Sequence, residues 1–312
     1  MTTALAHPNI ALIKYWGKQD TTDNLPATPS IAITLSGLTT ETVVRDAAAD
    51  RFVLDGVEVD DRKIARFLAD LRTKFDVPPL EIVSSNDFPS SAGLASSASG
   101  LAALTTAIDA HCELGLTAAQ RSGWARRGSA SAARSIFGGF VTLEGPTWTA
   151  RQLLAEDEWP MSVVVAVTDT AAKPVNSTQG MTISRNTSPY YRAWEDSTPR
   201  DFERAAVAVA NKDFDTLAPV AEHSSMKMHA LMISSLPPLL YWNAASVACL
   251  NAVTQLRADG VPVFATMDAG PQVKAVCLPD AAETVASTLG AQAGVLNIIR
   301  SGLGAGARTV AE

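Results

Sequence analysis

The sequence is poor in the residues that would place it in several common classes of protein. Its 312 residues include three cysteines, which are widely separated and form no CxxC pair, so a disulfide framework is not expected. The four histidines show no spacing typical of zinc ligands. No apolar run approaches the roughly 18 residues of a membrane span, and the N-terminus lacks the basic start and long apolar run of a signal peptide. We therefore expect no membrane partner and a cytoplasmic protein.

Charge of either sign is also sparse, and the balance is acidic. Charged residues make up 18% of the chain, with a formal net charge of -7. A general nucleic-acid binder would be basic, so no nucleic-acid partner is expected. An anionic small molecule is compatible with this charge, because a few local lysines and arginines can hold one inside an acidic protein. Hydrophobic residues make up 47%, which is enough for a substantial core and excludes wholesale disorder.

The hydrophobic pattern predicts strands early in the chain and an alternation of helices and strands later. Strands are predicted at 38–45, 80–84, 161–168, 263–268 and 274–278, with a hairpin at 52–59 that turns at Asp55-Gly56. Helices are predicted at 61–75, 96–114, 202–211, 214–232, 242–258 and 281–289. This order indicates an α+β protein in two halves. We place one lobe at residues 1–175 and the other at residues 176–312.

A stretch rich in glycine, alanine and serine joins a predicted strand to an alanine-rich helix. It is Phe88-Pro-Ser-Ser-Ala-Gly-Leu-Ala-Ser-Ser-Ala-Ser-Gly100. Small residues let a ligand approach the backbone closely, and the N–H groups and dipole of a helix start favour an anion. Neither a GxxxxGK[ST] loop nor a GxGxxG pattern is present. By composition, the stretch indicates phosphate binding or, equally, a helix start that packs tightly.

Three further polar features have ordinary explanations when each is taken alone. The segment 14–18, Lys-Tyr-Trp-Gly-Lys, could be an edge strand with snorkelling lysines. Arg134 follows Ser129 and Ser131 and could form a structural salt bridge, although its planar guanidinium also suits a carboxylate ligand. Asp268 precedes a Gly-Pro turn, where aspartate often serves as a turn former.

Together with the serine-rich stretch, four segments resemble one protein family. They are Asn9-Ile-Ala-Leu-Ile-Lys-Tyr-Trp-Gly-Lys18, Arg127-Gly-Ser-Ala-Ser-Ala-Ala-Arg-Ser-Ile-Phe-Gly-Gly139, Ser177-Thr-Gln-Gly-Met181 and Met267-Asp-Ala-Gly-Pro271. The serine-rich stretch resembles the nucleotide-phosphate loop of the GHMP kinase superfamily, and all five segments together resemble the mevalonate diphosphate decarboxylases. This resemblance implies a GHMP kinase-like two-lobed fold. Its N-terminal lobe would be like ribosomal protein S5 domain 2, its C-terminal lobe α/β, and its active site would lie in the cleft between them.

The resemblance implies ATP-dependent decarboxylation of mevalonate 5-diphosphate to isopentenyl diphosphate, with ATP and Mg²⁺, in a homodimer. The C3 hydroxyl would be phosphorylated first, and phosphate and CO₂ would then leave. Gln19 stands where many relatives carry a basic residue, and Ala130 replaces a usual glycine. These departures leave mevalonate 5-phosphate, giving isopentenyl phosphate, as the alternative substrate. A kinase without decarboxylation and a non-enzymatic nucleotide-binding module are further alternatives, against which the retained Asp268, Lys18 and Arg134 argue.

The resemblance also assigns site residues one by one. It implies that Asp268 faces the substrate's tertiary hydroxyl, that Lys18 keeps Asp268 ionised, and that Arg134 holds the substrate's carboxylate. The implied substrate contacts are Lys14, Tyr15, Trp16, Ser129, Ser131, Ser177, Thr178 and Met181. The implied nucleotide-phosphate contacts are Ser90, Ser91, Gly93, Leu94, Ala95, Ser96 and Ser97, and Ser97 is also the implied metal contact.

Overall fold

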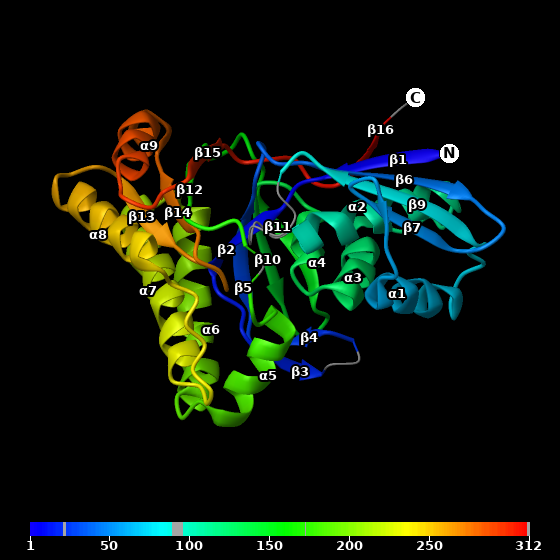
Figure 1. Ribbon diagram of the computed structural model, residues 1–312, viewed down its shortest axis with the longest axis horizontal. Coiled ribbons are helices and arrows are strands. Elements are labelled where there is room, and N and C mark those ends of the chain that lie inside the picture. Colours follow the sequence, from blue (N-terminus) through cyan, green and yellow to red (C-terminus); the bar gives the residue numbers. More distant parts are fainter. Residues whose placement is uncertain (21–22, 89–95, 172, 311–312) are drawn as a thin grey trace.

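The structure is a computed structural model that describes residues 1–20, 23–88, 96–171 and 173–310 (Figure 1). Three sheets lie one after another across the molecule. A six-stranded sheet with helices α1 to α4 occupies one end, and a four-stranded sheet with α6 to α9 occupies the other. A second four-stranded sheet lies between them (Figure 1). Among the described residues, no helix has the length and apolar character needed to cross a membrane.

The six-stranded sheet contains both ends of the chain. In spatial order its strands are β16 (Arg308–Val310), β1 (Thr2–Ala6), β6 (Thr40–Asp46), β9 (Leu80–Asn86), β7 (Arg51–Leu54) and β8 (Val57–Glu58). Neighbours are antiparallel except for the β7–β9 pair, which is parallel. The helices at this end are α1 (Arg62–Arg72), α2 (Ser96–His111), α3 (Ala118–Gly128) and α4 (Ala132–Ser135). Helix α2 packs on β1 and β6, which buries its apolar side chains.

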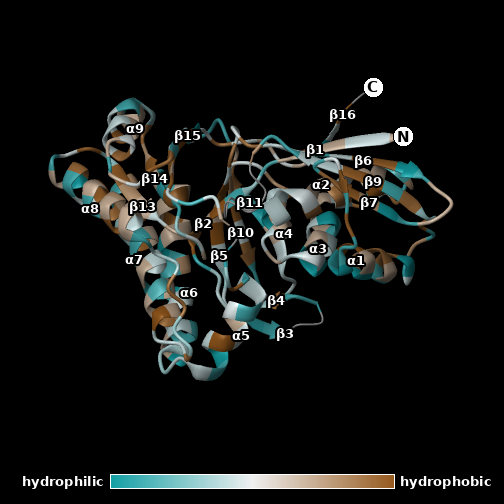
Figure 2. Ribbon diagram, in the orientation of Figure 1, coloured by the Kyte–Doolittle hydropathy of each residue, from teal (hydrophilic) through white to brown (hydrophobic). Residues whose placement is uncertain are grey.

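The central sheet is antiparallel and deeply buried. Its order is β11 (Thr149–Leu154), β10 (Phe140–Glu144), β5 (Ser30–Thr34) and β2 (Asn9–Ile13). Every residue of β2 and β5 is buried, because helices α6 and α7 cover one side and α4 approaches the other. Figure 2 shows the strands of this region coloured mainly as hydrophobic. A two-stranded ribbon, β3 (Lys18–Asp20) and β4 (Leu25–Pro26), follows β2.

The third sheet packs helices on both of its faces. Its order is β13 (Val263–Thr266), β14 (Val273–Cys277), β12 (Ser162–Val167) and β15 (Asn297–Ser301). Alternate residues of β12 face opposite sides. Val164 therefore packs with helices α8 (Ala244–Ala258) and α9 (Ala282–Gly290), while Val163 joins the core of the central sheet. The remaining helices are α5 (Ser177–Thr187), α6 (Tyr191–Ala210), α7 (Phe214–Ile233) and the short 3₁₀ turn η1 (Pro279–Ala281).

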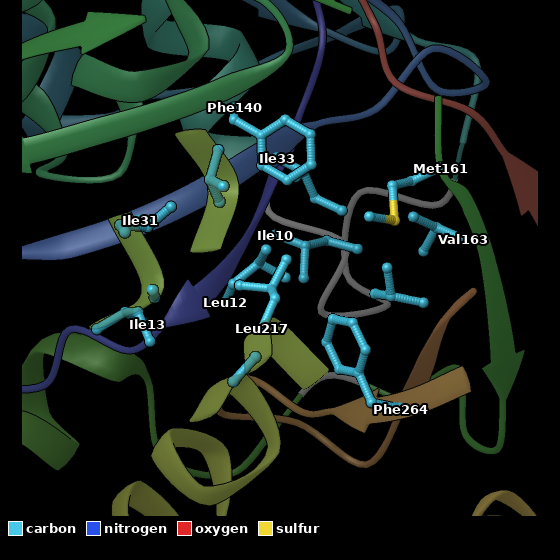
Figure 3. Close-up of a cluster of buried hydrophobic side chains, with 14 of the residues drawn as sticks. Ile10, Leu12, Ile13, Ile31, Ile33, Phe140, Met161, Val163, Leu217 and Phe264 are labelled. Carbon is cyan, nitrogen blue, oxygen red and sulfur yellow. The ribbon is translucent and has the colours of Figure 1, made fainter. Parts of the chain in front are cut away.

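One hydrophobic cluster joins the central sheet to the third sheet and to α7. Figure 3 shows Ile10, Leu12 and Ile33 of the central sheet beside Leu217 of α7, with Phe264 of β13 pointing into the same cluster. All five side chains are almost completely buried. Because both halves of the chain contribute to this core, the end of β2 and the end of β13 are held close together.

Several predicted elements are confirmed with small shifts of boundary. The hairpin turns at Asp55 and Gly56, and Asp61 caps α1 by accepting hydrogen bonds from the backbone N–H groups of Lys63 and Ile64. The helix predicted from residue 202 instead begins at Tyr191. Helix α6 contains Pro199, a residue that normally ends a helix, and runs through it.

The division of the chain at residues 175 and 176 stays a prediction. One detail bears on it: β16, near the C-terminus, pairs antiparallel with β1, with Thr3 opposite Val310. Residues 308–310 therefore belong to the same sheet as the first strand, and the two ends of the chain lie beside one another (Figure 1).

We expect Phe264→Ala to lower the free energy of unfolding by about 3–5 kcal/mol, because it leaves a cavity in the shared core. Phe264 is fully buried and packs against Phe214 with ring centroids 5.7 Å apart. Denaturant unfolding monitored by circular dichroism would measure the loss. The control is Val207→Ala on the outer face of α6, where the side chain is 61% exposed and the expected change is within about 0.5 kcal/mol. Equal effects for the two variants would contradict the shared core.

Candidate active site

A cavity of about 530 Å³ opens where the central sheet, the third sheet and helices of both halves meet. Its walls carry seven cationic side chains and two carboxylates. The cations are Lys14, Lys18, Lys63, Arg66, Arg127, Arg134 and Lys173, and the carboxylates are Asp70 and Asp268. A concave, predominantly cationic cavity attracts anions, even in a protein of net charge -7.

Asp268 lies just beyond the end of β13 and is held by two lysines. Lys14, the first residue after β2, places its Nζ 2.7 Å from Oδ1 of Asp268. Lys274 of β14 places its Nζ 3.1 Å from Oδ2. Both lysine side chains are 1% exposed, whereas that of Asp268 is 31% exposed and lines the cavity. Each carboxylate oxygen thus has a lysine partner while the group stays open to a ligand.

Burial and charge act in opposite directions on this trio. Burial opposes ionisation of Asp268, but Lys14 and Lys274 outweigh it and hold the pKa of the carboxyl well below its usual range. Burial lowers the pKa of Lys14 to about 8, against the attraction of Asp268, and the charges of Lys274 and Arg134 lower it further. At neutral pH Asp268 is therefore an anion.

Lys18 does not contact Asp268, in contrast to its predicted role. Its Nζ donates a hydrogen bond of 2.6 Å to Oδ1 of Asn24 in the β3–β4 ribbon. Burial lowers the pKa of Lys18, and the nearby charges of Lys63 and Arg66 on α1 add to this shift. The cation beside Asp268 is Lys14 rather than the predicted Lys18, and Lys274 is the second.

The path of the chain between the two lysines explains the difference. Strand β2 ends at Ile13, and Gly17 then adopts a φ of +117°, which turns Lys18 into the ribbon. A Cβ atom at Gly17 would clash with the hydroxyl of Tyr191, so both the backbone conformation and the space require glycine.

Arg134 is a buried cation in the short helix α4. Its Nε donates to Oδ1 of Asn9 at 3.2 Å and its Nη1 to Oγ of Ser30 at 2.6 Å. Asn9 is itself fixed by bonds from its Nδ2 to the carbonyl of Ser131 and to Oγ of Ser135. Within the described part of the chain Arg134 forms no ion pair, and burial lowers its pKa to about 10. A charge buried without a counter-ion favours an anionic ligand.

All eight predicted substrate contacts line this cavity. Ser129 and Ser131 lie at the end of α3 and the start of α4, with their hydroxyl oxygens 3.1 Å apart. Ser177 and Thr178 form the first turn of α5, whose N-terminus faces the cavity. That helix start, capped by Asn176, can stabilise an anion through its dipole.

Tyr15, Trp16 and Met181 also line the cavity, and the last two belong to a hydrophobic cluster. Trp16 is 2% exposed, and its indole N–H donates to Oγ of Ser184 at 3.0 Å. Burial raises the pKa of Tyr15. Trp16 is therefore a fixed apolar wall whose only polar atom is already engaged.

The predicted phosphate stretch lies largely outside the described residues. Ser90, Ser91, Gly93, Leu94 and Ala95 all fall there. Ser96 opens α2, and Ser97, in the same first turn, is exposed and lines the cavity.

Five cationic residues of the site were not assigned from the sequence, among them Arg127, which stands in a segment quoted for the resemblance. Lys173 donates from Nζ to Oγ of Ser177 at 2.9 Å and to the carbonyl of Ala269 at 3.0 Å. Lys173 lies just before the segment 177–181 that resembles the family, but a single lysine in a loop forms no sequence pattern that would indicate a site. Lys63 and Arg66 lie on the polar face of a predicted amphipathic helix, where charges usually face only water. Lys274 sits in a strand and shows its role only through the antiparallel pairing of β13 and β14.

Comparisons with known proteins identify the family of the chain. The diphosphomevalonate decarboxylase-like N-terminal domain matches residues 6–150, and the mevalonate 5-diphosphate decarboxylase C-terminal domain matches residues 163–298. The chain is 36% identical to the diphosphomevalonate decarboxylase of Saccharomyces cerevisiae, over 84% of this chain and 74% of that protein. It is 34% identical to the human diphosphomevalonate decarboxylase, over 91% of this chain and 79% of that protein.

Solved structures extend the similarity to three dimensions. The mevalonate diphosphate decarboxylase of Staphylococcus aureus matches with a TM-score of 0.93 at 36% identity, over 99% of this chain and 98% of that one. A structure of MDDEF in complex with MVAPP, AMPPCP and magnesium matches with a TM-score of 0.91 at 34% identity, over 100% and 99% of the two chains. The fold is that of the GHMP kinases, as the sequence predicted. The chain belongs to the mevalonate diphosphate decarboxylase family.

We expect Lys14 to titrate near pH 8 and to titrate at higher pH in Lys274→Met. Below its pKa Lys14 is charged. Removing the like charge of Lys274 stabilises the charged form of Lys14, so its pKa rises. NMR of lysine-labelled protein, with the Lys14 resonance assigned through Lys14→Arg, would measure both titrations. Lys274→Arg keeps the charge and should leave the titration near that of the wild type. An unchanged titration in Lys274→Met would contradict the coupling.

Proposed function

We propose that the chain catalyses the ATP-dependent decarboxylation of mevalonate 5-diphosphate to isopentenyl diphosphate, releasing ADP, phosphate and CO₂. The observation that carries this proposal is the pair of groups in one cavity. Asp268, an anion held between two lysines, and Arg134, a buried cation that forms no ion pair with any described residue, both line it. A substrate with a hydroxyl on one carbon and a carboxylate on the neighbouring carbon presents a complement to each.

Asp268 suits the first step and the later build-up of positive charge. The C3 hydroxyl of the substrate attacks the γ-phosphorus of ATP, the bond between that phosphorus and the bridging oxygen of ADP breaks, and the hydroxyl proton passes to water. A carboxylate whose pKa is held low is a weak base, so the main contribution of Asp268 is to orient the hydroxyl by accepting its hydrogen bond. When phosphate departs with the C3–O electrons, the same negative charge stabilises the cationic C3.

Arg134 suits the carboxylate that leaves as CO₂. Its guanidinium is fixed by Asn9 and Ser30, so it can present its remaining donors in one plane without moving. The bond that breaks joins the carboxylate carbon to C2, and its electrons form the C2–C3 double bond as phosphate leaves C3. The carboxylate is therefore carried by C2, one carbon from the hydroxyl, and Arg134 and Asp268 bracket these two positions.

ATP and Mg²⁺ fit the part of the cavity nearest α2. The start of that helix presents the positive end of the helix dipole, which is favourable to phosphate oxygens. Mg²⁺ is usually held by substrate phosphates and a few protein oxygens, and the exposed hydroxyl of Ser97 is one such oxygen. When bound, Mg²⁺ supplies neutralising charge on the ATP phosphates.

A cluster of cations favours the diphosphate over the monophosphate. Lys63 and Arg66 on α1 lie close enough to Lys18 to lower its pKa, and Arg127 of α3 lines the same cavity. Crowded like charges are stabilised by a ligand of high negative charge. These residues compensate for the basic residue that many relatives carry where this chain has Gln19. Mevalonate 5-phosphate decarboxylation, and phosphorylation without decarboxylation, stay as alternatives.

The deciding experiment measures ATP-dependent release of CO₂ and ADP from mevalonate 5-diphosphate and mevalonate 5-phosphate side by side. We expect kcat/KM to be at least roughly tenfold higher for the diphosphate. A higher value for the monophosphate would overturn the substrate assignment. ADP release without CO₂ from both would identify a kinase, and ATP binding without turnover would identify a binding module.

We further propose that the protein is a cytoplasmic homodimer. The resemblance to the decarboxylase family supports the dimer, and the sequence supports the location. Light scattering coupled to size-exclusion chromatography would measure the mass in solution and test the dimer directly.

We predict that Asp268→Asn lowers kcat for CO₂ release by far more than tenfold. A tenfold loss corresponds to about 1.4 kcal/mol in the activation free energy. The change keeps the size of the side chain but removes the negative charge that orients the hydroxyl and stabilises C3. ATP affinity, measured by calorimetry, should stay within about twofold, because Asp268 lies on the substrate side. Glu283→Gln, which removes an exposed carboxylate paired with Arg300, is the control. A kcat above a tenth of the wild-type value would show that Asp268 only forms the turn and has no catalytic role.

We predict that Arg134→Lys lowers kcat/KM for the mevalonate substrate by at least roughly tenfold, about 1.4 kcal/mol. Lysine keeps the charge but lacks the planar fork that holds a carboxylate at two points. ATP affinity without substrate should barely change. Arg126→Lys is a matched control, since Arg126 is also buried but donates to backbone carbonyls and does not line the cavity. A rise in the KM for ATP alone would instead make Arg134 a nucleotide contact.

A further inference from the structure

Helix α7 presents three buried polar side chains to the back of the active site. Ser224 and Ser225 are fully buried, and His229 is 1% exposed. Ser225 and His229 are four residues apart, so they lie one turn apart on the same face of the helix. That face packs against β2 and β13, the strands that lead into Lys14 and Asp268.

The contacts of these side chains fall on backbone groups beside Lys14 and Asp268. Oγ of Ser224 accepts a hydrogen bond from the backbone N–H of Lys14 at 2.9 Å. Oγ of Ser225 accepts one from the N–H of Met267 at 2.9 Å and donates to its carbonyl at 3.3 Å. The carbonyl of Met267 also accepts a hydrogen bond from the ring of His229.

These backbone groups lie just past the ends of their strands. Strand β2 ends at Ile13 and β13 ends at Thr266, so the ladders no longer bind the residues that follow. Lys14 and Met267 are nevertheless almost fully buried. Buried N–H and C=O groups require partners, and here α7 provides them.

His229 acts in this position as a neutral donor. Burial lowers its pKa to about 3, and the nearby charges of Lys14 and Lys274 oppose its protonation further, against the attraction of Asp268. A protonated ring would add a third cation beside a single carboxylate. The neutral ring can donate to Met267 without competing with Lys14 for Asp268.

We propose that Ser224, Ser225 and His229 are positioning residues that fix the backbone on both sides of the Lys14–Asp268 ion pair and so aim Asp268 into the cavity. The proposal rests on the decarboxylase function proposed above. Correct orientation of reacting groups contributes strongly to rate, and a displacement of about 1 Å can lower it by roughly a hundredfold. None of the three side chains lines the cavity, so they act through Lys14 and Asp268.

The test compares variants that remove a bond with variants that keep it. Ser225→Ala and His229→Leu remove donors to Met267, whereas His229→Asn keeps an N–H near the position of Nδ1. We expect kcat for CO₂ release to fall by at least roughly tenfold in the first two, with the KM for ATP within about twofold of wild type. His229→Asn should recover kcat to within about threefold of wild type.

Ser301→Ala is the control for a loss of stability alone. Oγ of Ser301 accepts hydrogen bonds from the backbone N–H groups of Ser36 and Gly37 at 3.0 and 3.1 Å, away from the cavity. This variant should lower the melting temperature comparably to Ser225→Ala but keep the wild-type kcat. If Ser225→Ala and His229→Leu also keep the wild-type kcat, α7 serves only to stabilise the fold and the proposal is overturned.

A second measurement separates failure of this proposal from failure of the proposed function. The titration of Lys14 near pH 8 depends on its distance from Asp268 and needs no turnover. We expect Ser225→Ala to shift that titration and Ser301→Ala to leave it unchanged. An unshifted titration in Ser225→Ala would overturn the positioning role. A wild-type protein that releases no CO₂ from either substrate would overturn the function, while a shifted titration would still support the positioning.

Discussion

The attraction between Asp268 and two buried lysines is the constraint on which the site depends. Burying three charged groups together is costly unless each is paired closely. The carboxylate of Asp268 forms an ion pair with each lysine. The two lysine charges lower the pKa of the carboxyl by more than burial raises it. The excess positive charge, shared with Arg134, leaves a place for anions. The same cluster of charges therefore explains both the ionised state of Asp268 and the affinity that the cavity should have for a carboxylate and phosphates.

The fold is the means by which this cluster is assembled. Lys14 and Asp268 are separated by 254 residues, yet the core around Leu217 and Phe264 brings the ends of β2 and β13 together. Antiparallel pairing of β13 with β14 then sets Lys274 beside Thr266, two residues before Asp268. Packing, strand register and charge thus depend on one another, and no local segment could form the site by itself.

The sequence alone predicted much of the site because contiguous segments carry it. Asp268, Arg134, Ser129 and Ser177 stand in segments that resemble a family, and the cavity brings them together. The partners of Asp268 were harder to predict. Lys14 and Lys18 are four residues apart, and only the turn at Gly17 decides which one reaches Asp268.

The unpredicted parts of the fold have equally physical causes. Strands β2 and β5 are buried on both faces, so they lack the alternation of apolar and polar residues that marks a half-exposed strand. The first half of α6 was not predicted, and it contains a proline, which normally ends a helix. The turns around this proline nevertheless stay helical, and they bury side chains such as Trp194. In each case tertiary packing decided what the local pattern could not.

The isolation of Arg134 has a consequence for turnover. Under the proposed reaction the substrate arrives with a carboxylate and the product leaves without one. The group that neutralises this buried guanidinium is therefore destroyed by the chemistry itself, and Arg134 is left with no counter-ion among the residues that the structure describes. Affinity for the product should consequently be weaker than affinity for the substrate, so that accumulating isopentenyl product competes poorly for the site.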